Sequence, residues 1–395
     1  MRHRFPFLAH WGPRLALLGA LGGCVEPYAP DVIDAPASYL VVDGAINGNG
    51  PTTVLLTRTI NLAAPGPPAV EKGAKLFIVD DAGARYALVE RASGTYRSDS
   101  LVLSPARQYQ LRITTATNVA YASDLVPLKI TPPIDKLGWD IDATQLRLLL
   151  STHDGQQQSR YYRWGFVETW EFHSAYNSSL EYDYALKQIA PRSTPIYTCW
   201  RTERTSSIRQ GSTAQLSQDA LTDFGVLNIS NRAERLQIRY SALVSQYAET
   251  AEEFAYYELL RKNTEAVGSV NDPLPVQLTG NVHRVDNAQE PVLGYVGAHT
   301  VQQKRIFIDR AELPRGLGFD SPYQDCTTAE ELLFDPFGDT ILYPNTRIFG
   351  DSSLVPIDLY FGPPPGGPTI LGYTGSSRAC VDCRLRGTPR KPSFW

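Results

Sequence analysis

The cysteines are the residues of this chain whose type and spacing offer the most chemistry. Cys24 ends the run Leu21-Gly22-Gly23-Cys24, in which small residues precede a thiol at the end of an apolar stretch. This pattern is typical of a lipidation site, where the sulfur takes an acyl chain and cleavage on the N-terminal side makes the cysteine the first mature residue. The sequence therefore predicts a lipid anchor at Cys24.

The other four cysteines form an even set, which in an exported chain predicts two structural disulfides. Two of them have the C-x-x-C spacing of redox and zinc sites, but they lie in a tail rich in glycine, serine and arginine, where no helix start is expected. We therefore expect disulfides, with the three possible pairings open, and no bound metal. The four residues are Cys199, Cys326, Cys380 and Cys383.

The acidic and histidine side chains form no recognisable catalytic pattern. The sequence contains no nucleophile elbow, zinc-protease helix motif, phosphate-binding loop or dinucleotide fingerprint. Asp140 and Asp142 share one face of an expected strand and could bind a cation, but solvent-facing strand positions explain them equally well. We therefore expect no catalytic residue and no cofactor.

Aromatic residues are concentrated between positions 161 and 200. Such rings form stacking platforms for planar ligands and contact sites for protein partners. The first part alternates with a period of two, which predicts a strand with Tyr162, Trp164 and Phe166 on its core face. The later, less periodic part is the candidate binding surface. Its aromatic residues are Phe172, Tyr176, Tyr182, Tyr184, Tyr197 and Trp200.

The elements that position these residues begin after a leader. Residues 1–23 carry Arg2, Arg4 and Arg14 beside a short apolar run, which predicts a secretory signal peptide. The run is well short of the roughly 20 residues that a transmembrane helix needs. Residues 24–38 contain several prolines and predict an extended linker.

Composition favours strands over helices. Glycine and proline contribute 30 and 29 of the 395 residues, a density that suits short strands and turns. The net charge is −4 and no stretch gathers Lys and Arg, so nucleic acid is not an expected partner. The sequence predicts a mainly β chain of two tandem immunoglobulin-like β-sandwich domains, residues 39–131 and 132–310, followed by an irregular, disulfide-fastened tail over 311–395.

One inserted helix is expected over residues 250–263. Thr250 and Glu253 have the spacing of a capping box, in which the hydroxyl accepts from a backbone N–H and the carboxylate reaches back. A single helical turn is also expected over 327–333 in the tail.

Short motifs follow one another over essentially the whole chain. They are Glu26-Pro27-Tyr28 after Cys24, Leu40-Val41-Val42-Asp43-Gly44, Tyr161-Tyr162-Arg163-Trp164 with Glu168-Thr169-Trp170, Leu259-Leu260-Arg261-Lys262-Asn263-Thr264, Gly294-Tyr295 with Arg305-Ile306-Phe307, Cys380-Val381-Asp382-Cys383-Arg384-Leu385-Arg386-Gly387, and Pro392-Ser393-Phe394-Trp395. In type and order these motifs are similar to those of the DUF4249 family, outer-membrane lipoproteins of Bacteroidota-type bacteria that carry a domain of unknown function.

The resemblance implies a location and a partner but no chemistry. Family members are lipid-anchored to the outer membrane, and which face of that membrane carries this chain, the cell surface or the periplasmic side, stays open. The resemblance further implies a non-enzymatic accessory or ligand-binding partner of a TonB-dependent transporter in nutrient uptake. A cell-surface adhesion or structural module is the alternative, and a hydrolase using Asp140 or Asp142 ranks last.

Overall fold

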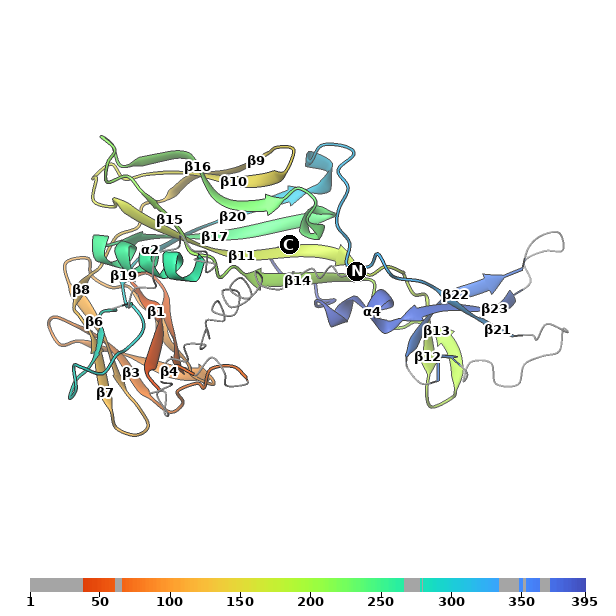
Figure 1. Cartoon of the computed structure of the whole chain (residues 1–395), viewed down its shortest axis with the longest axis horizontal. Coiled ribbons are helices and arrows are strands. Elements are labelled where there is room, and N and C mark those ends of the chain that lie inside the picture. Colours follow the sequence, from red (N-terminus) through yellow and green to blue (C-terminus); the bar gives the residue numbers. More distant parts are fainter. Residues whose placement is uncertain are drawn as a thin grey trace, which may run out of the picture.

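The computed structural model describes residues 38–60, 66–265, 278, 280–333, 348–350, 353–362 and 370–395. The expected leader, the linker as far as residue 37 and the anchor residue Cys24 lie outside the described residues. Within them the chain is mainly β, as the sequence predicts, and its strands fall into three groups (Figure 1).

The first group is a single curled sheet built mostly from the N-terminal strands. These are β1 (Leu40–Asn47), β2 (Pro51–Arg58), β3 (Lys75–Asp80), β4 (Arg85–Ala92), β5 (Thr95–Ser100), β6 (Gln108–Thr114), β7 (Ala120–Ser123), β8 (Val126–Pro127), β18 (Val282–Arg284) and β19 (Ala298–His299). They are hydrogen-bonded in the order β18-β7-β6-β3-β4-β5-β2-β1-β19, with β8 beside β6. Alternate residues such as Leu40, Val42 and Ile46 are buried, because successive strand side chains point to opposite faces.

Residues 282–299 lie in the range expected for the second sandwich, but their strands join the first sheet. Strand β18 pairs with β7, and β19 runs parallel to β1, with Ala298 opposite Ile46. Gly294 allows this approach: its φ is +129°, and a Cβ there would lie 2.1 Å from the carbonyl oxygen of Val42. A parallel pair joins segments far apart in sequence, so no local pattern predicts it.

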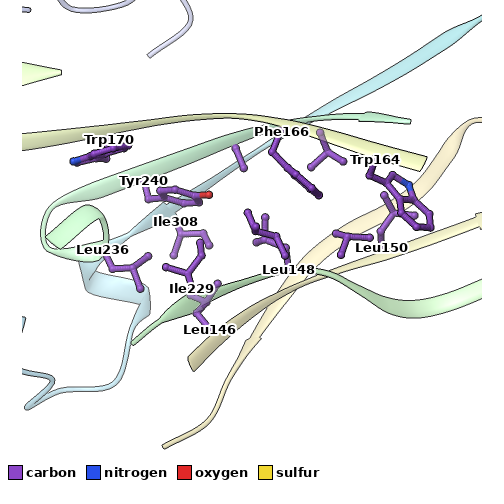
Figure 2. Packing of buried hydrophobic residues seen from close by; sticks show 14 of the residues in the cluster. Leu146, Leu148, Leu150, Trp164, Phe166, Trp170, Ile229, Leu236, Tyr240 and Ile308 are labelled. Carbon is purple, nitrogen blue, oxygen red and sulfur yellow. The ribbon is translucent and has the colours of Figure 1, made fainter. Parts of the chain in front are cut away.

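The second group consists of two sheets that face each other. The smaller contains β9 (Ile134–Ile141), β10 (Gln145–His153) and β16 (Ala220–Ser230); the larger contains β11 (Tyr161–His173), β14 (Thr198–Arg204), β15 (Arg209–Ser212), β17 (Arg239–Glu249) and β20 (Val301–Asp309). Leu148 and Leu150 of β10 pack toward Trp164 and Phe166 of β11 (Figure 2). Tyr162, Trp164 and Phe166 are at most 2% exposed, which confirms the predicted core face.

Helix α2 (Ala251–Glu265) lies where the first two groups meet (Figure 1). Thr250 caps it as predicted, since its hydroxyl accepts from the backbone N–H of Glu253 at 3.1 Å. The Glu253 carboxylate lies within ion-pair distance of Arg163 and His299. No described helix has the length and apolar character that a membrane span requires.

The third group is a distal lobe of short elements. It contains β12 (Leu180–Asp183), β13 (Gln188–Pro191), β21 (Ala329–Leu332), β22 (Leu354–Phe361), β23 (Ile370–Ser377), helix α4 (Arg378–Val381) and the 3-10 turn η3 (Cys383–Leu385). The prediction of a helical turn at 327–333 is wrong, because β21 pairs with β23 along Ala329–Leu332. A strand partner from elsewhere in the chain overrides the weak local helix preference of this stretch.

Candidate ligand-binding site

Two disulfides position the end of the chain in the distal lobe. Cys199 of β14 bonds to Cys383, and Cys326 bonds to Cys380. The two cysteines of the C-x-x-C motif therefore have separate partners, which confirms the expected disulfide set and answers the open question of pairing. The first bond fastens the short segment Arg378–Leu385 to strand β14, and the second fastens it to the loop that precedes β21.

An open pocket of about 470 Å³ lies beside this fastened segment. Residues of β12 and those that follow β12 and β13 supply one wall, β22 supplies another, and α4 and η3 with Asp382 between them supply the third. Behind it, Ile196, Ile357 and Val381 form a small buried cluster of the lobe. The residues that line the pocket are Glu181, Tyr182, Tyr184, Arg192, Ile196, Leu354, Val355, Pro356, Arg378, Asp382 and Arg384.

Asp382 organises the charges of the pocket. Its buried carboxylate accepts from Nε and Nη2 of Arg384 at 2.7 and 2.8 Å and from Nε of Arg378 at 3.3 Å. Burial alone raises the pKa of Asp382, but the hydrogen bonds from Arg384 outweigh it and hold that pKa below its usual value. Asp382 thus stays ionised and fixes two guanidinium groups at the pocket wall.

Arg192 is the third guanidinium of the pocket and is largely buried. It donates to the Ser178 hydroxyl at 2.8 Å and to the Leu180 carbonyl at 2.6 Å, and it lies 3.6 Å from Glu181. Burial lowers the pKa of Arg192, and repulsion by Arg384 lowers it further, although Glu181 opposes the shift. Arg192 and Arg384 both line the pocket, and each lies beside a carboxylate.

The aromatic residues that were predicted to form a binding surface lie in three kinds of position. Tyr182 and Tyr184 line the pocket, with ring centroids 4.9 Å apart in an edge-on arrangement. The prediction that Phe172 lies on the surface is wrong, because Phe172 occupies an inward position of β11 and is 1% exposed. Tyr176 and Tyr197 are half-buried, the first donating its hydroxyl to the Cys326 carbonyl at 2.9 Å and the second stacked on a histidine ring at 4.4 Å.

Trp200 lines a second, more open pocket of about 530 Å³, formed by residues of β14 and by residues 385–388. Its backbone N–H donates to the Thr388 carbonyl at 2.8 Å, and the N–H of Thr388 donates back at 2.9 Å. Arg201 and Arg386 are among the residues around it. The structure thus brings three of the six predicted aromatic residues to concave surfaces.

The carboxylates considered for a hydrolase are engaged in local structure. Asp140 accepts from Arg147 at 2.7 Å, and Asp142 accepts from the backbone of Thr144 and Gln145 in the following turn. The described residues contain no group of three or more His, Cys, Asp and Glu side chains arranged to hold a metal ion.

Of the pocket residues the sequence pointed only to Tyr182 and Tyr184, and not to the charged ones, which are Glu181, Arg192, Arg378, Asp382 and Arg384. For the last three a signal was present, because they lie in or beside the C-x-x-C motif and alternate in charge. It carried little weight because the position of this segment depends on disulfide partners that the sequence does not reveal.

Fold and site together define a mainly β protein with a concave, charged and aromatic pocket in a disulfide-fastened lobe. The chain belongs to the DUF4249 family: the model of this domain of unknown function matches residues 25–305. No curated protein matches the chain. Among solved structures, the adhesin InvE of Yersinia pseudotuberculosis is 15% identical with a TM-score of 0.14, over 53% of this chain and 55% of that chain. The chain thus spans about half the length of this adhesin, and the likeness carries no conclusion.

Proposed function

We propose that this protein is a non-enzymatic, lipid-anchored accessory protein of the outer membrane that binds a ligand for a TonB-dependent transporter in nutrient uptake. The observation that carries the ligand-binding part is the pocket beside Asp382, which three guanidinium groups, two tyrosine rings and apolar residues of β22 line together. A concave surface with a few convergent polar groups is the usual form of a ligand site.

The position of this pocket supports a capture role. It lies in the distal lobe, away from the curled N-terminal sheet (Figure 1). The first described strand, β1, begins at Leu40, only a short chain length after the proposed anchor at Cys24. An anchor at that residue would hold the curled sheet nearer the membrane and leave the distal lobe free to meet a ligand or a transporter.

Tandem units related to immunoglobulin-like sandwiches are part of the same proposal, although the first group is a single curled sheet that also takes in β18 and β19. Two separate buried clusters support two independent units, one containing Leu56 and Ile78 and the other Leu148 and Phe166. Such units serve as spacers and partner-binding modules in many surface proteins.

Two experiments test the proposal. Labelled palmitate should enter the wild-type protein and fail to enter Cys24→Ser, and that variant should leave the membrane fraction. Affinity purification from solubilised outer membrane should recover a β-barrel transporter with the wild-type chain. Repeated purification without a transporter, combined with ligand-independent binding to cells or matrix, would favour the adhesion module instead.

A further inference from the structure

We propose that the pocket beside Asp382 takes an acidic oligosaccharide, a sugar chain with carboxylate groups. This inference rests on the ligand-binding role proposed above and names the ligand class. Its basis is the combination of two exposed arginines, a pair of tyrosine rings of which one is exposed, and an open shape in one site.

The pocket has more cationic than anionic side chains in its lining. Arg192, Arg378 and Arg384 face it, against the carboxylates of Glu181 and Asp382. The Asp382 side chain is 3% exposed and its oxygens already accept from two arginines, so it projects little repulsion toward a ligand. Glu181 is similarly engaged, since Oε1 accepts from the Ser193 backbone and hydroxyl and Oε2 lies 3.6 Å from Arg192.

Arg378 is the group best placed to meet an anion. Its side chain is 57% exposed, and its contact with Asp382 uses Nε alone, at 3.3 Å. Among the described residues its two Nη groups have no protein partner, so the planar end of the guanidinium is open to a carboxylate. Arginine binds carboxylates through two parallel N–H donors, so an exposed guanidinium group of this kind is a specific binding group for a carboxylate.

Arg384 adds a second exposed guanidinium group at the same wall of the pocket. Arg384 is 38% exposed, so a ligand can reach it from solvent while its Nε and Nη2 remain bonded to Asp382.

The tyrosines favour a sugar over an acidic peptide. Tyr184 is 55% exposed, and Tyr182 meets it edge-on at 4.9 Å, so one ring supports the orientation of the other. The face of a fixed aromatic ring packs against the C–H face of a pyranose, whereas a glutamate or aspartate side chain has no comparable flat apolar face. Leu354, Val355 and Pro356 add apolar surface on the opposite wall.

The volume and shape fit a segment of a chain. About 470 Å³ lies within the range of small-ligand pockets and accommodates a few sugar units. Because the pocket is open to solvent, a longer saccharide can continue beyond it on both sides.

Isothermal titration calorimetry with the purified, disulfide-intact chain tests the inference, with hexagalacturonate as the acidic probe, maltohexaose as the neutral probe and polyglutamate as the acidic peptide. Hexagalacturonate should bind, should weaken as NaCl is raised, and should exceed each of the other two probes by about tenfold or more. Arg378→Gln and Tyr184→Ala should each weaken hexagalacturonate binding by about five- to tenfold.

Arg232→Gln is the matched control. Arg232 is also an exposed arginine, at 63%, with one acidic partner, Asp320, and it lies outside the pocket. It should leave affinity unchanged, and all three variants should retain the wild-type melting temperature. Equal affinities of Arg378→Gln and Arg232→Gln, equal binding of maltohexaose, or equal binding of polyglutamate would each overturn the acidic-sugar assignment. The titration contains no transporter, so its failure leaves the proposed partnership standing and is distinguishable from failure of the purification experiment.

Discussion

Glu253 and His299 lie against each other at the junction of the first two strand groups, with Nε2 of His299 3.5 Å from Oε1 of Glu253. Both side chains are almost fully buried, at 1% and 2% exposure. Glu253 lies in the first turn of helix α2, and His299 ends strand β19, immediately before the chain crosses into β20 of the second group. The pair therefore joins the two groups at the point where the chain passes between them.

Arg163 and Glu249 complete this buried junction. Arg163 forms a short ion pair with Glu249 and lies 3.5 Å from Glu253. Burial raises the pKa of Glu249, and Arg163 offsets only part of that rise. Burial acts in the same direction on Glu253, but His299 and Arg163 outweigh it and hold the pKa of Glu253 below its usual value.

Glu253→Gln should lower the free energy of unfolding by about 3 kcal/mol, because removing one partner of a buried ionic group leaves the others uncompensated. Chemical denaturation monitored by intrinsic fluorescence measures this loss. Glu252→Gln is the control, since Glu252 occupies the same first helical turn but is exposed. Equal losses in the two variants would show that the helix terminus, and not the buried junction, is responsible.

Asp382 should make the distal lobe sensitive to acid. Its pKa is lower in the folded chain than in the unfolded chain, so its stabilising contribution is present above the unfolded value, about pH 4, and is lost as pH falls through the folded value. Asp382→Asn should therefore cost about 1.5–3 kcal/mol near neutral pH and much less in strong acid. Denaturation curves of both proteins across this range measure the difference.

Asp325→Asn serves as the comparison for this acid effect. Asp325 lies in the same lobe next to Cys326 and is exposed. Its replacement should shift the unfolding curve by no more than about 0.5 kcal/mol at any pH. A loss at Asp382 that stays constant from neutral to acid pH would contradict the assigned ionised state.

The bond between Cys326 and Cys380 should stabilise the lobe locally. Replacing both residues by serine removes a crosslink across 54 residues and should cost about 2–4 kcal/mol. Hydrogen exchange should accelerate in β22 and α4, which neighbour the crosslink, and stay unchanged in β1 of the distant sheet. Uniform acceleration across both regions would mean that the lobe and the first sheet unfold as one unit.

Leu148→Ala should open a cavity between the two facing sheets. Leu148 is fully buried among residues of β11 and β16 (Figure 2), so the expected loss is about 2–5 kcal/mol. Val102→Ala provides the control at a 93% exposed position, where about 0.5 kcal/mol or less is expected. Thermal and urea denaturation both measure this contrast, and a loss below about 1 kcal/mol for Leu148→Ala would contradict the packed core.

Features that depend on neighbouring residues can be read from short stretches of this chain. Period-two alternation placed Tyr162, Trp164 and Phe166 in the core, and the spacing of Thr250 and Glu253 marked the start of α2. Strands and turns depend on local backbone preference and on which face is apolar, so these features are visible in short stretches of sequence. The even set of four cysteines likewise predicted two disulfides, although not their partners.

The contacts between segments far apart in the chain are visible in the folded structure and not in the sequence. Cys199 and Cys383 are 184 positions apart, and β19 pairs with β1, the first described strand of the chain. Local composition carries no information about such contacts, because their free energy is gained only when remote surfaces pack together. The charged pocket depends on these contacts. Its arginines and Asp382 from the end of the chain lie opposite Tyr182 and Arg192, and the two disulfides hold that end of the chain in place.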